Sequence, residues 1–419
     1  MIDITVLRTD PEALERSLAR RGIEVDVDEL VKLDAEVRRV RHQSETLRAA
    51  QRDAGKRIAQ LSGEDKEAAI AEMGRVSEEF KDLAASADAL QAEFDARWVM
   101  MPNLVDPSAA DGFTDADNVE ISRRGEVSVF DFVPRDHATL GETLDIIDTD
   151  RGAKVSGSRF GYLKGKAVLL ELALVRFAMD KLLAAGFTPM VPPVLVREQA
   201  LFGTGFFPGD REQVYEIPAD DLFLVGTSEV PMAAYHTDEI IEPDSLPIRY
   251  AGFSTCFRRE AGTYGKDTAG IFRVHQFDKV EMFAFVLPQT SPDEHERLLG
   301  IEEEIVTAYD VPYRIVNVAA GDLGSSAAKK YDIEAWFPTQ ETYRELTSCS
   351  NTTDFQSRRL KIRYRGDKSN ELLHTLNGTA VAVGRSILAI IENHQREDGS
   401  VVIPEALRPY TGFEFIEAP

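Results

Sequence analysis

Apolar and small side chains recur every three or four residues between residues 30 and 94, and this spacing limits how the N-terminal region can fold. A first run extends from Leu30 to Leu61 and a second from Ala69 to Phe94, separated by the polar segment 62–65. Such spacing places one packing stripe on each of two helices. Because the connection is short, the helices must run antiparallel, each about 45–50 Å long. The sequence therefore predicts an all-α antiparallel coiled-coil hairpin over residues of about 30–97, with its turn at residues 62–65.

The two predicted helices carry opposite charge. Residues 38–58 contain seven Lys or Arg against Glu45 and Asp53, a net charge of +5, whereas residues 64–97 contain four Lys or Arg against ten Asp or Glu, a net charge of −6. Charge runs of this kind usually belong to a solvated surface with salt bridges inside the hairpin. The alternative is a basic ridge that follows the phosphates of a nucleic acid. Charge alone favours the first interpretation and leaves the second open.

The composition of the 419-residue chain argues against several classes of protein. A net charge of −24 is unsuited to a protein that coats nucleic acid along its length. No apolar run reaches the ~18 residues that span a membrane, and the N-terminus lacks the basic and apolar regions of a signal peptide. The two cysteines, Cys256 and Cys349, and the seven scattered histidines give neither a disulfide scaffold nor the spacing of a zinc site. We therefore expect a cytoplasmic protein with no membrane partner and no zinc.

Short β-rich runs alternate with helical patterns from about residue 119 onward. The many turns between these runs favour a mainly antiparallel sheet. Near the N-terminus, Asp10 followed by Pro11 predicts the start of a short helix, with Asp10 as the N-cap and Pro11 at the first helical position. We therefore predict an α+β chain with an N-terminal domain at residues 1–106, which contains the hairpin, and a second domain at residues 107–419.

Two segments, 257–262 and 272–281, combine cations, carboxylates and an aromatic ring, and we expect them to form two strands joined by a glycine-containing loop. Side chains two residues apart on a strand share a face. One face of the first strand would therefore present Arg258 and Glu260. One face of the second would present Arg273, His275, Phe277, Lys279 and Glu281. This mixture suits a ligand with phosphates, a flat base and an ammonium group, although a surface hairpin with alternating charges would give the same pattern.

Four other segments give weaker signals of the same kind. Residues 169–193 combine an apolar helix, a glycine and a strand that ends in proline. Residues 226–231 close an apolar strand with either a helix N-cap or an ammonium-binding carboxylate. Residues 344–351 place a carboxylate and a hydroxyl three apart, which either bind one hard cation or end a polar strand. Residues 376–385 place small residues before an arginine at a helix start, where the backbone could approach a ligand.

In this order the segments resemble the motifs of the class II aminoacyl-tRNA synthetases, in the form used by seryl-tRNA synthetases of the bacterial type. Motif 1 corresponds to residues of about 169–193, motif 2 to about 253–281 and motif 3 to about 376–392. The resemblance covers nearly the whole chain and implies an antiparallel sheet flanked by helices, in a homodimer built through motif 1. It also implies that L-serine and ATP give seryl-adenylate and pyrophosphate, and that serine then passes to tRNA(Ser) and also to tRNA(Sec).

The resemblance assigns roles to individual residues. Arg258 and Arg385 would stabilise the charge of the reacting phosphates. Serine would be bound by Thr227, Ser228, Glu229, Glu281, Asn377 and Thr379. ATP would be bound by Arg258, Arg259, Glu260, Arg273, Val274, Phe277, Glu345, Leu346, Thr347, Ser348 and Arg385. Glu345 and Ser348 would also hold Mg²⁺ together with ATP. The long variable arm of the tRNA would be gripped by Arg38, Arg41, Arg48, Arg52 and Lys56 of the hairpin.

Two other functions are compatible with such a catalytic fold. An enzyme that activates an amino acid for a carrier protein should lack the helical arm. This sequence predicts that the arm is present. A non-catalytic tRNA binder or regulator should have lost Arg258 or Arg385, and both are present. One position departs from many relatives: Ala269 stands where an arginine is common, in a motif 2 loop expected to meet the acceptor end of the tRNA.

Overall fold

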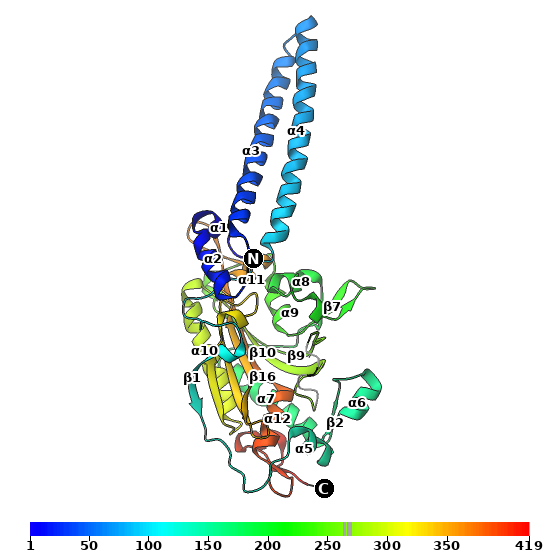
Figure 1. Cartoon of the computed structure of the whole chain (residues 1–419), viewed down its shortest axis with the longest axis vertical. Helices are drawn as coiled ribbons and strands as arrows, with labels where there is room; N and C mark the ends of the chain where they lie inside the picture. The colour runs from blue at the N-terminus through cyan, green and yellow to red at the C-terminus, as the bar shows by residue number, and fades with distance from the viewer. Residues whose placement is uncertain (263–264, 266–269, 419) are drawn as a thin grey trace. The chain divides into compact units, whose positions relative to one another are not determined.

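The chain forms two compact units, Met1–Met101 and Pro102–Pro419, in a computed structural model (Figure 1). The structure describes residues 1–262, 265 and 270–418. Within that part of the chain, no helix is both long enough and apolar enough to cross a membrane.

The first unit is entirely helical and begins with two short helices. Its helices are α1 (Ile4–Thr9), α2 (Pro11–Arg20), α3 (Val27–Ile58) and α4 (Gly63–Trp98). Asp10 is the N-cap of α2 and accepts the Ala13 N–H, and Pro11 occupies the first helical position, as the sequence predicted. Arg8 donates two hydrogen bonds to the buried carboxylate of Asp34, which fastens α1 to α3.

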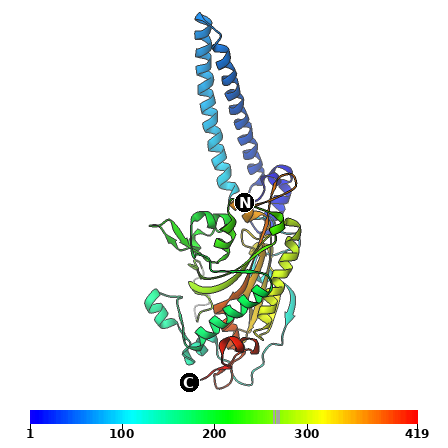
Figure 2. The same ribbon diagram turned by 180° about the vertical axis from the view of Figure 1, so that it is seen from behind.

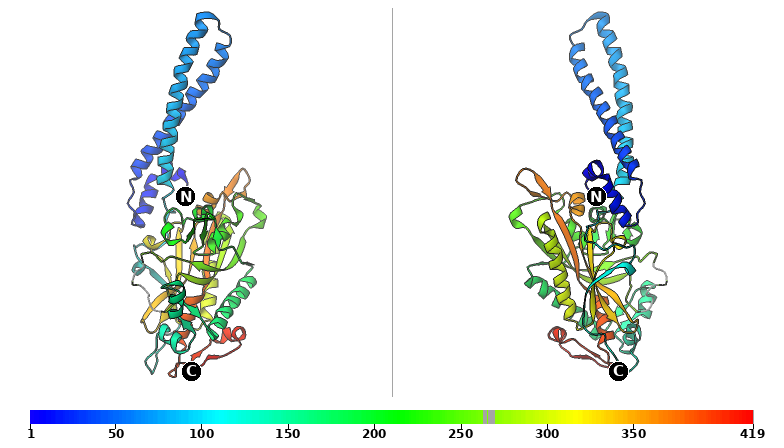
Figure 3. Two further views of the ribbon diagram at one scale, coloured as in Figure 1. Left: turned by 90° about the vertical axis from the view of Figure 1, so that its right-hand side faces the viewer. Right: turned by 60° about the vertical axis from the view of Figure 1, so that its left-hand side comes forward.

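The helices α3 and α4 form the predicted antiparallel hairpin, and the views of Figures 2 and 3 show them running side by side. Their lengths are 32 and 36 residues. Buried positions on the seam include Val37 and Val40 on α3 and Phe94 on α4. The turn was predicted at residues 62–65 and instead lies at residues 59–62, because Ser62 is the N-cap and the chain is helical from Gly63 onward. The acidic side chains at positions 64 and 65 favour this earlier start, since they stabilise the positive end of a helix dipole.

The second unit is built on an eight-stranded sheet in the order β1-β11-β12-β13-β16-β10-β9-β4. The strands, in that order, are β1 (Val119–Arg124), β11 (Tyr313–Asn317), β12 (Lys329–Phe337), β13 (Thr342–Asn351), β16 (His374–Ala382), β10 (Gln276–Val286), β9 (Ile248–Phe257) and β4 (Thr188–Met190). All neighbouring pairs are antiparallel except β4 with β9. This arrangement confirms the predicted α+β fold with a mainly antiparallel sheet.

One face of this sheet packs against α7 (Lys166–Ala184), α10 (Ser291–Thr307) and α12 (Val383–Asn393). Along β10, Val280, Met282 and Ala284 enter that core, so the side chains between them point to the opposite face. The remaining helices are α5 (His137–Thr143), α6 (Thr149–Ser156), α8 (Glu198–Thr204), α9 (Glu229–Ala233), α11 (Phe355–Leu360) and α13 (Arg408–Thr411). The smaller sheets use β2 (Ile147–Asp148), β3 (Tyr162–Leu163), β5 (Leu195–Val196), β6 (Glu216–Ile217), β7 (Leu222–Leu224), β8 (Ile240–Ile241), β14 (Arg363–Arg365), β15 (Asn370–Leu372), β17 (Val401–Val402) and β18 (Phe415–Ile416).

The predicted strands at residues 257–262 and 272–281 extend less far than the sequence suggested. Strand β9 ends at Phe257 and β10 begins at Gln276, so Arg258 and Glu260 lie beyond the strand ends. The ladder stops because the His275 N–H donates to the carbonyl of Arg159 and because Glu260 adopts a positive φ of 50°. The prediction that both segments are strands throughout was therefore wrong for residues 258–262 and 272–275.

Candidate functional site

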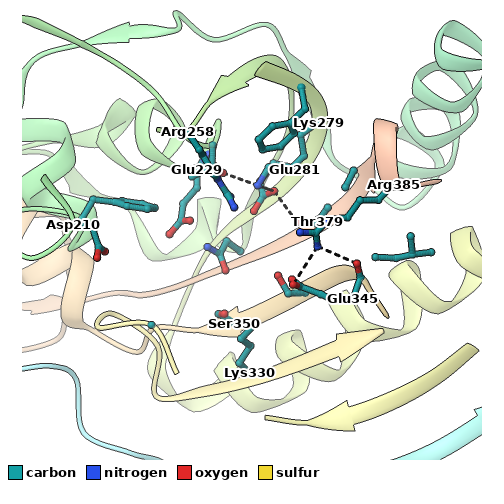
Figure 4. A pocket seen from close by; sticks show the side chains of 18 of the residues that line it. Asp210, Glu229, Arg258, Lys279, Glu281, Lys330, Glu345, Ser350, Thr379 and Arg385 are labelled. Atoms are coloured by element: carbon teal, nitrogen blue, oxygen red, sulfur yellow. Dashed lines mark hydrogen bonds and ion pairs between the residues drawn. The ribbon is translucent and has the colours of Figure 1, made fainter. Parts of the chain in front are cut away.

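A cavity of about 400 Å³ lies on the face of the large sheet opposite α7 and α10 (Figure 4). Its wall comes from β10, β16, β13 and β12, together with residues near α9 and the start of α12. Most residues that the sequence assigned to serine or to ATP line this one cavity. These are Thr227, Glu229, Arg258, Glu260, Arg273, Val274, Phe277, Glu281, Glu345, Leu346, Ser348, Asn377, Thr379 and Arg385.

One end of the cavity is built around the carboxylate of Glu281, which is buried (Figure 4). The ammonium Nζ of Lys279 lies 2.5 Å from Glu281 Oε2 and donates to Thr227 Oγ1 at 2.8 Å. The Thr379 hydroxyl donates to the same Glu281 oxygen at 3.2 Å. Glu281 is therefore fixed from two sides by groups on β10 and β16.

A second carboxylate, Glu229, faces the same end of the cavity from the start of α9. Gln356 Nε2 donates to Glu229 Oε1 at 2.7 Å, and the Glu229 N–H donates to Thr227 Oγ1 at 3.2 Å. Burial, reinforced by the charge of Glu281, raises the pKa of Glu229 to about 7. An ammonium group placed beside Glu229 would favour its ionised form, so this end suits a small molecule with one positive charge.

The other end of the cavity carries the positive charge. Arg385 Nη1 donates to the carbonyl oxygen of Glu345 at 3.0 Å and lies 3.2 Å from its carboxylate Oε2. Burial by itself would raise the pKa of Glu345, but the cations Lys330 and Arg385 outweigh burial and lower that pKa to about 2. Glu345 is therefore ionised throughout the physiological range, and it can serve as a ligand for a hard cation.

A β-bulge brings Glu345 and Ser348 to the same face of β13. Residues three apart on a regular strand point to opposite faces. The pairing of β13 with β12 shifts between Glu345 and Thr347, so that Leu346 is the additional residue. This shift returns Ser348 to the cavity side, and the two side chains together fit the predicted binding of Mg²⁺ with ATP.

Phe277 offers an aromatic ring to the cavity between these two ends. The guanidinium of Arg258 lies 5.3 Å from the centre of this ring, and its Nε donates to the carbonyl oxygen of Gly226 at 3.2 Å. Arg273 Nη1 lies 2.7 Å from Glu260 Oε2. The ring can stack on a flat base, while the arginines can reach phosphates.

Other assigned side chains do not line the cavity. The Ser228 hydroxyl contacts the carbonyl oxygen of Gly252 at 3.4 Å, and the Arg259 guanidinium lies 5.6 Å from the centre of the Tyr215 ring. Thr347 donates instead to Glu302 Oε2 at 3.0 Å, on the α10 side of the sheet.

His275, which was expected on the ligand face, also lies outside the cavity. Its ring Nδ1 lies 2.8 Å from the Arg258 carbonyl oxygen, and the ring packs against Phe160.

The site also includes residues to which the sequence gave no role: two line the cavity, and one contacts Glu229. Lys279 was placed on the predicted ligand face but was given no function. Its position between Phe277 and Glu281, which were both assigned to ligands, could have indicated a role in the site. Lys330 lines the cavity beside Glu345. Gln356 was not recognised at all, since its contact with Glu229 joins residues 127 positions apart.

The basic residues assigned to tRNA binding are all exposed on α3, namely Arg38, Arg41, Arg48, Arg52 and Lys56. Arg38 and Lys56 pair with Asp34 and Asp53, carboxylates of their own helix. These two contacts therefore do not use the acidic side chains of α4 to neutralise the basic charge of α3. Ala269 lies outside the described residues. Within the described part of the chain, no group of three or more His, Cys, Asp or Glu side chains is arranged to hold a metal ion by itself.

Comparison with known proteins matches each of the two units to a tRNA synthetase family. The seryl-tRNA synthetase N-terminal domain family matches residues 1–105, and the class II tRNA synthetase core domain family (G, H, P, S and T) matches residues 214–394. The serine–tRNA ligase of Thermobifida fusca is 53% identical to this chain, over 98% of each protein. That of Streptomyces coelicolor is 52% identical, again over 98% of each.

A solved structure shares the fold over its whole length. The seryl-tRNA synthetase of Pyrococcus horikoshii, in a crystal structure with ATP, has a TM-score of 0.95 and 41% identity, covering 100% of both chains. The prolyl-tRNA synthetase of Giardia lamblia, at 13% identity and a TM-score of 0.57, shares only the fold of part of the chain. The chain belongs to the seryl-tRNA synthetase family of class II aminoacyl-tRNA synthetases.

Proposed function

We propose that the cavity of the second unit activates L-serine with ATP, giving seryl-adenylate and pyrophosphate, before serine passes to tRNA(Ser) and also to tRNA(Sec). One observation supports this assignment above the others. A single cavity has two buried carboxylates and a hydroxyl at one end, Glu229, Glu281 and Thr379, and arginines at the other. The first end suits the ammonium and hydroxyl of serine, and the second suits phosphates.

The serine end would use the charge of Glu229 for the substrate ammonium and the oxygens of Glu281 and Thr379 for its hydroxyl. A site that hydrogen-bonds a substrate hydroxyl rejects the analogue without it by about 10⁴-fold or more, which would exclude alanine. Threonine would be excluded by steric fit, a weaker effect of about 1–3 kcal/mol. We assign serine binding to Thr227, Ser228, Glu229, Glu281, Asn377 and Thr379.

The reaction requires no general base, because the carboxylate of serine is already a nucleophile. The protein has to align this carboxylate with the α-phosphorus and stabilise the charge that develops there. Arg258 and Arg385 are the residues that we assign to this task. Mg²⁺ held by Glu345 and Ser348 would neutralise phosphate charge, and we propose no role for zinc. We assign ATP binding to Arg258, Arg259, Glu260, Arg273, Val274, Phe277, Glu345, Leu346, Thr347, Ser348 and Arg385.

Serine-dependent ATP–pyrophosphate exchange tests the assignment of the substrate. We expect exchange with serine, and at most weak exchange with threonine or alanine. The activity should require Mg²⁺ and should survive removal of zinc by a chelator. Exchange that depends on another amino acid but not on serine would show the proposal to be wrong.

The helical hairpin would hold the tRNA, so that residues 1–106 serve tRNA binding and residues 107–419 serve catalysis. Replacing Arg41, Arg48 and Arg52 with glutamine should weaken charging of tRNA(Ser) and reduce its salt dependence, while leaving pyrophosphate exchange unchanged. A matched control replaces three exposed cations of α4 with glutamine, namely Lys66, Arg75 and Lys81. Equal charging by the two triple variants would argue against a specific role of the α3 surface.

We further propose a cytoplasmic homodimer formed through motif 1. The support is an apolar surface on α7, where Leu169, Leu172 and Leu183 are between 47% and 59% exposed, and two-fold dimers are the commonest closed assembly. Light scattering should give the mass of a dimer for the wild type and a shift toward monomer for Leu172→Glu. The control Ile70→Glu changes an equally exposed side chain of the hairpin and should remain dimeric.

A further inference from the structure

Lys279 is a buried lysine in the middle of the serine end of the cavity. Its side chain is 7% exposed, and its Nζ contacts Glu281 Oε2 at 2.5 Å and Thr227 Oγ1 at 2.8 Å. Lysine is rarely buried unless it is paired. The contacts join strand β10 to the loop before α9, which bears Glu229.

The position of Lys279 determines the charge at this end of the cavity. Glu229 and Glu281 together contribute two negative charges when ionised, and Lys279 contributes one positive charge. The sum is −1, which one substrate ammonium balances. Without Lys279 the same end would hold two buried carboxylates and no ammonium in contact with Glu281, an arrangement in which like charges disfavour ionisation.

Lys279 also limits how Glu281 can turn. Both Lys279 and Thr379 contact Oε2 of Glu281, and this leaves the other oxygen of that carboxylate to accept a hydrogen bond from a substrate hydroxyl. A carboxylate held in this way has its orientation set before the substrate arrives, which reduces the cost of ordering it on binding.

We propose that Lys279 is a positioning and specificity-determining residue, which orients Glu281 and sets a charge that admits an amino acid with one ammonium and a neutral hydroxyl side chain. The proposal rests on the proposed function, in which this end of the cavity receives serine. A purely structural lysine would behave differently: its loss would lower the stability of the protein, because removing one partner of a buried ion pair is strongly destabilising, but it would not change which amino acid is preferred.

The discriminating probe is L-2,3-diaminopropionate, in which an ammonium group replaces the hydroxyl of serine. In the wild type, its second positive charge would lie beside Lys279 and should be rejected. In Lys279→Met, which keeps a similar length, this end holds two carboxylates without the lysine, and the second ammonium of the diamine can take the place of the lost lysine and favour the ionised form of both carboxylates. Specificity should therefore move toward the diamine.

The experiment measures pyrophosphate exchange with both amino acids. For Lys279→Met we expect kcat/KM for serine to fall by on the order of 10²-fold, as loss of one partner of a buried charge pair in a binding site implies, with most of the change in KM for serine and little in KM for ATP. We expect the ratio of kcat/KM for the diamine to that for serine to rise at least about tenfold. The control Lys361→Met removes an exposed lysine that lies 3.7 Å from Asp238, and should leave both values unchanged.

A double variant keeps the proposal testable if the single variant folds poorly. Lys279→Met with Glu281→Gln removes both charges of the pair and should be no less active toward serine than Glu281→Gln alone, since Lys279 is argued to act through Glu281. A further loss of about tenfold in the double variant would mean that Lys279 acts independently, and would overturn the positioning role.

The outcomes separate this inference from the proposed function. If the wild type shows no serine-dependent exchange, the proposed function fails. If the wild type is active and folded Lys279→Met retains the same kcat/KM for serine, or the same ratio of diamine to serine, the assignment of Lys279 alone fails.

Discussion

Replacing Glu229 with glutamine should stabilise the protein above pH 7 while removing its ability to bind serine. Glu229 is 6% exposed, and burial raises its pKa from 4.5 to about 7. The folded protein therefore keeps a proton that the unfolded chain releases between these two pH values. Stability must fall as the pH rises through that window, because the folded state binds more protons than the unfolded state.

The size of the effect follows from the shift in pKa. A rise from 4.5 to about 7 corresponds to about 3 kcal/mol of stability, which is lost by pH 8 and fully retained below pH 4.5. Glutamine has no charge to bury, and its carbonyl oxygen can still accept the hydrogen bond from Gln356. We therefore expect Glu229→Gln to match the wild type near pH 4.5 and to exceed its stability by up to about 3 kcal/mol at pH 8.

Denaturant unfolding between pH 5 and pH 8 measures the stability, and pyrophosphate exchange measures the function. In the wild type, kcat/KM for serine should rise with pH toward about 7 as Glu229 ionises. In Glu229→Gln it should be lower by on the order of 10²-fold or more at pH 8, since the ammonium loses its charged partner. Glu302→Gln is the matched control, because Glu302 is equally buried with a pKa raised by burial but does not line the cavity.

The control variant should share the gain in stability at high pH and keep the kinetics of the wild type. The reasoning is refuted if Glu229→Gln is no more stable than the wild type at pH 8. It is equally refuted if the difference in stability between them is the same at pH 5 and at pH 8.

Three further substitutions test other parts of the site. Arg258→Ala should lower the exchange rate by on the order of 10²-fold or more, while its midpoint of unfolding stays unchanged because the side chain is exposed. Glu345→Gln should raise the Mg²⁺ concentration needed for half-maximal exchange about tenfold or more. Because the pKa of Glu345 is about 2, its ionisation should not change the Mg²⁺ requirement of the wild type between pH 6 and pH 8. Gly378→Ala should cost about 1–3 kcal/mol of stability in denaturant unfolding, because a Cβ at this position would lie 2.7 Å from Glu302 Oε1.

The features that the sequence predicted well depend on local periodicity or on short motifs. The hairpin followed from spacing alone, since a repeat of three and four residues defines a helix face wherever the chain lies. The cavity residues came from resemblance to a family, and the structure gathers most of them in one place. The turn at residues 59–62 was predicted about three residues too late. Helix ends depend on capping residues, and capping follows no repeating pattern in the sequence.

The features that the sequence did not predict depend on contacts between distant segments. Lys279 and Thr227 are 52 residues apart, so nothing in either segment shows that they touch. The early end of β9 is similar. The Arg258 N–H still donates to the His275 carbonyl, but the His275 N–H donates to Arg159, which is distant in sequence, and not back to Arg258. The direction of Thr347 likewise depends on Glu302, which belongs to a separate helix.

Two bulges interrupt the alternation of side chains in the strands that line the cavity. Besides the additional Leu346 in β13, the pairing of β16 with β10 shifts between Thr379 and Val381, so that Ala380 is additional in β16. Leu346 and Ala380 are both buried. Each bulge reverses the parity of the strand beyond it. Ser348 thereby joins Glu345 on the cavity side. Thr379 pairs with Glu281 directly before the bulge of β16, and Ala382 beyond the bulge again lines the cavity. One inserted apolar residue, Leu346, thus brings Glu345 and Ser348, which we propose hold Mg²⁺, to one face of the sheet. An apolar residue gives no sign in the sequence that it is a bulge.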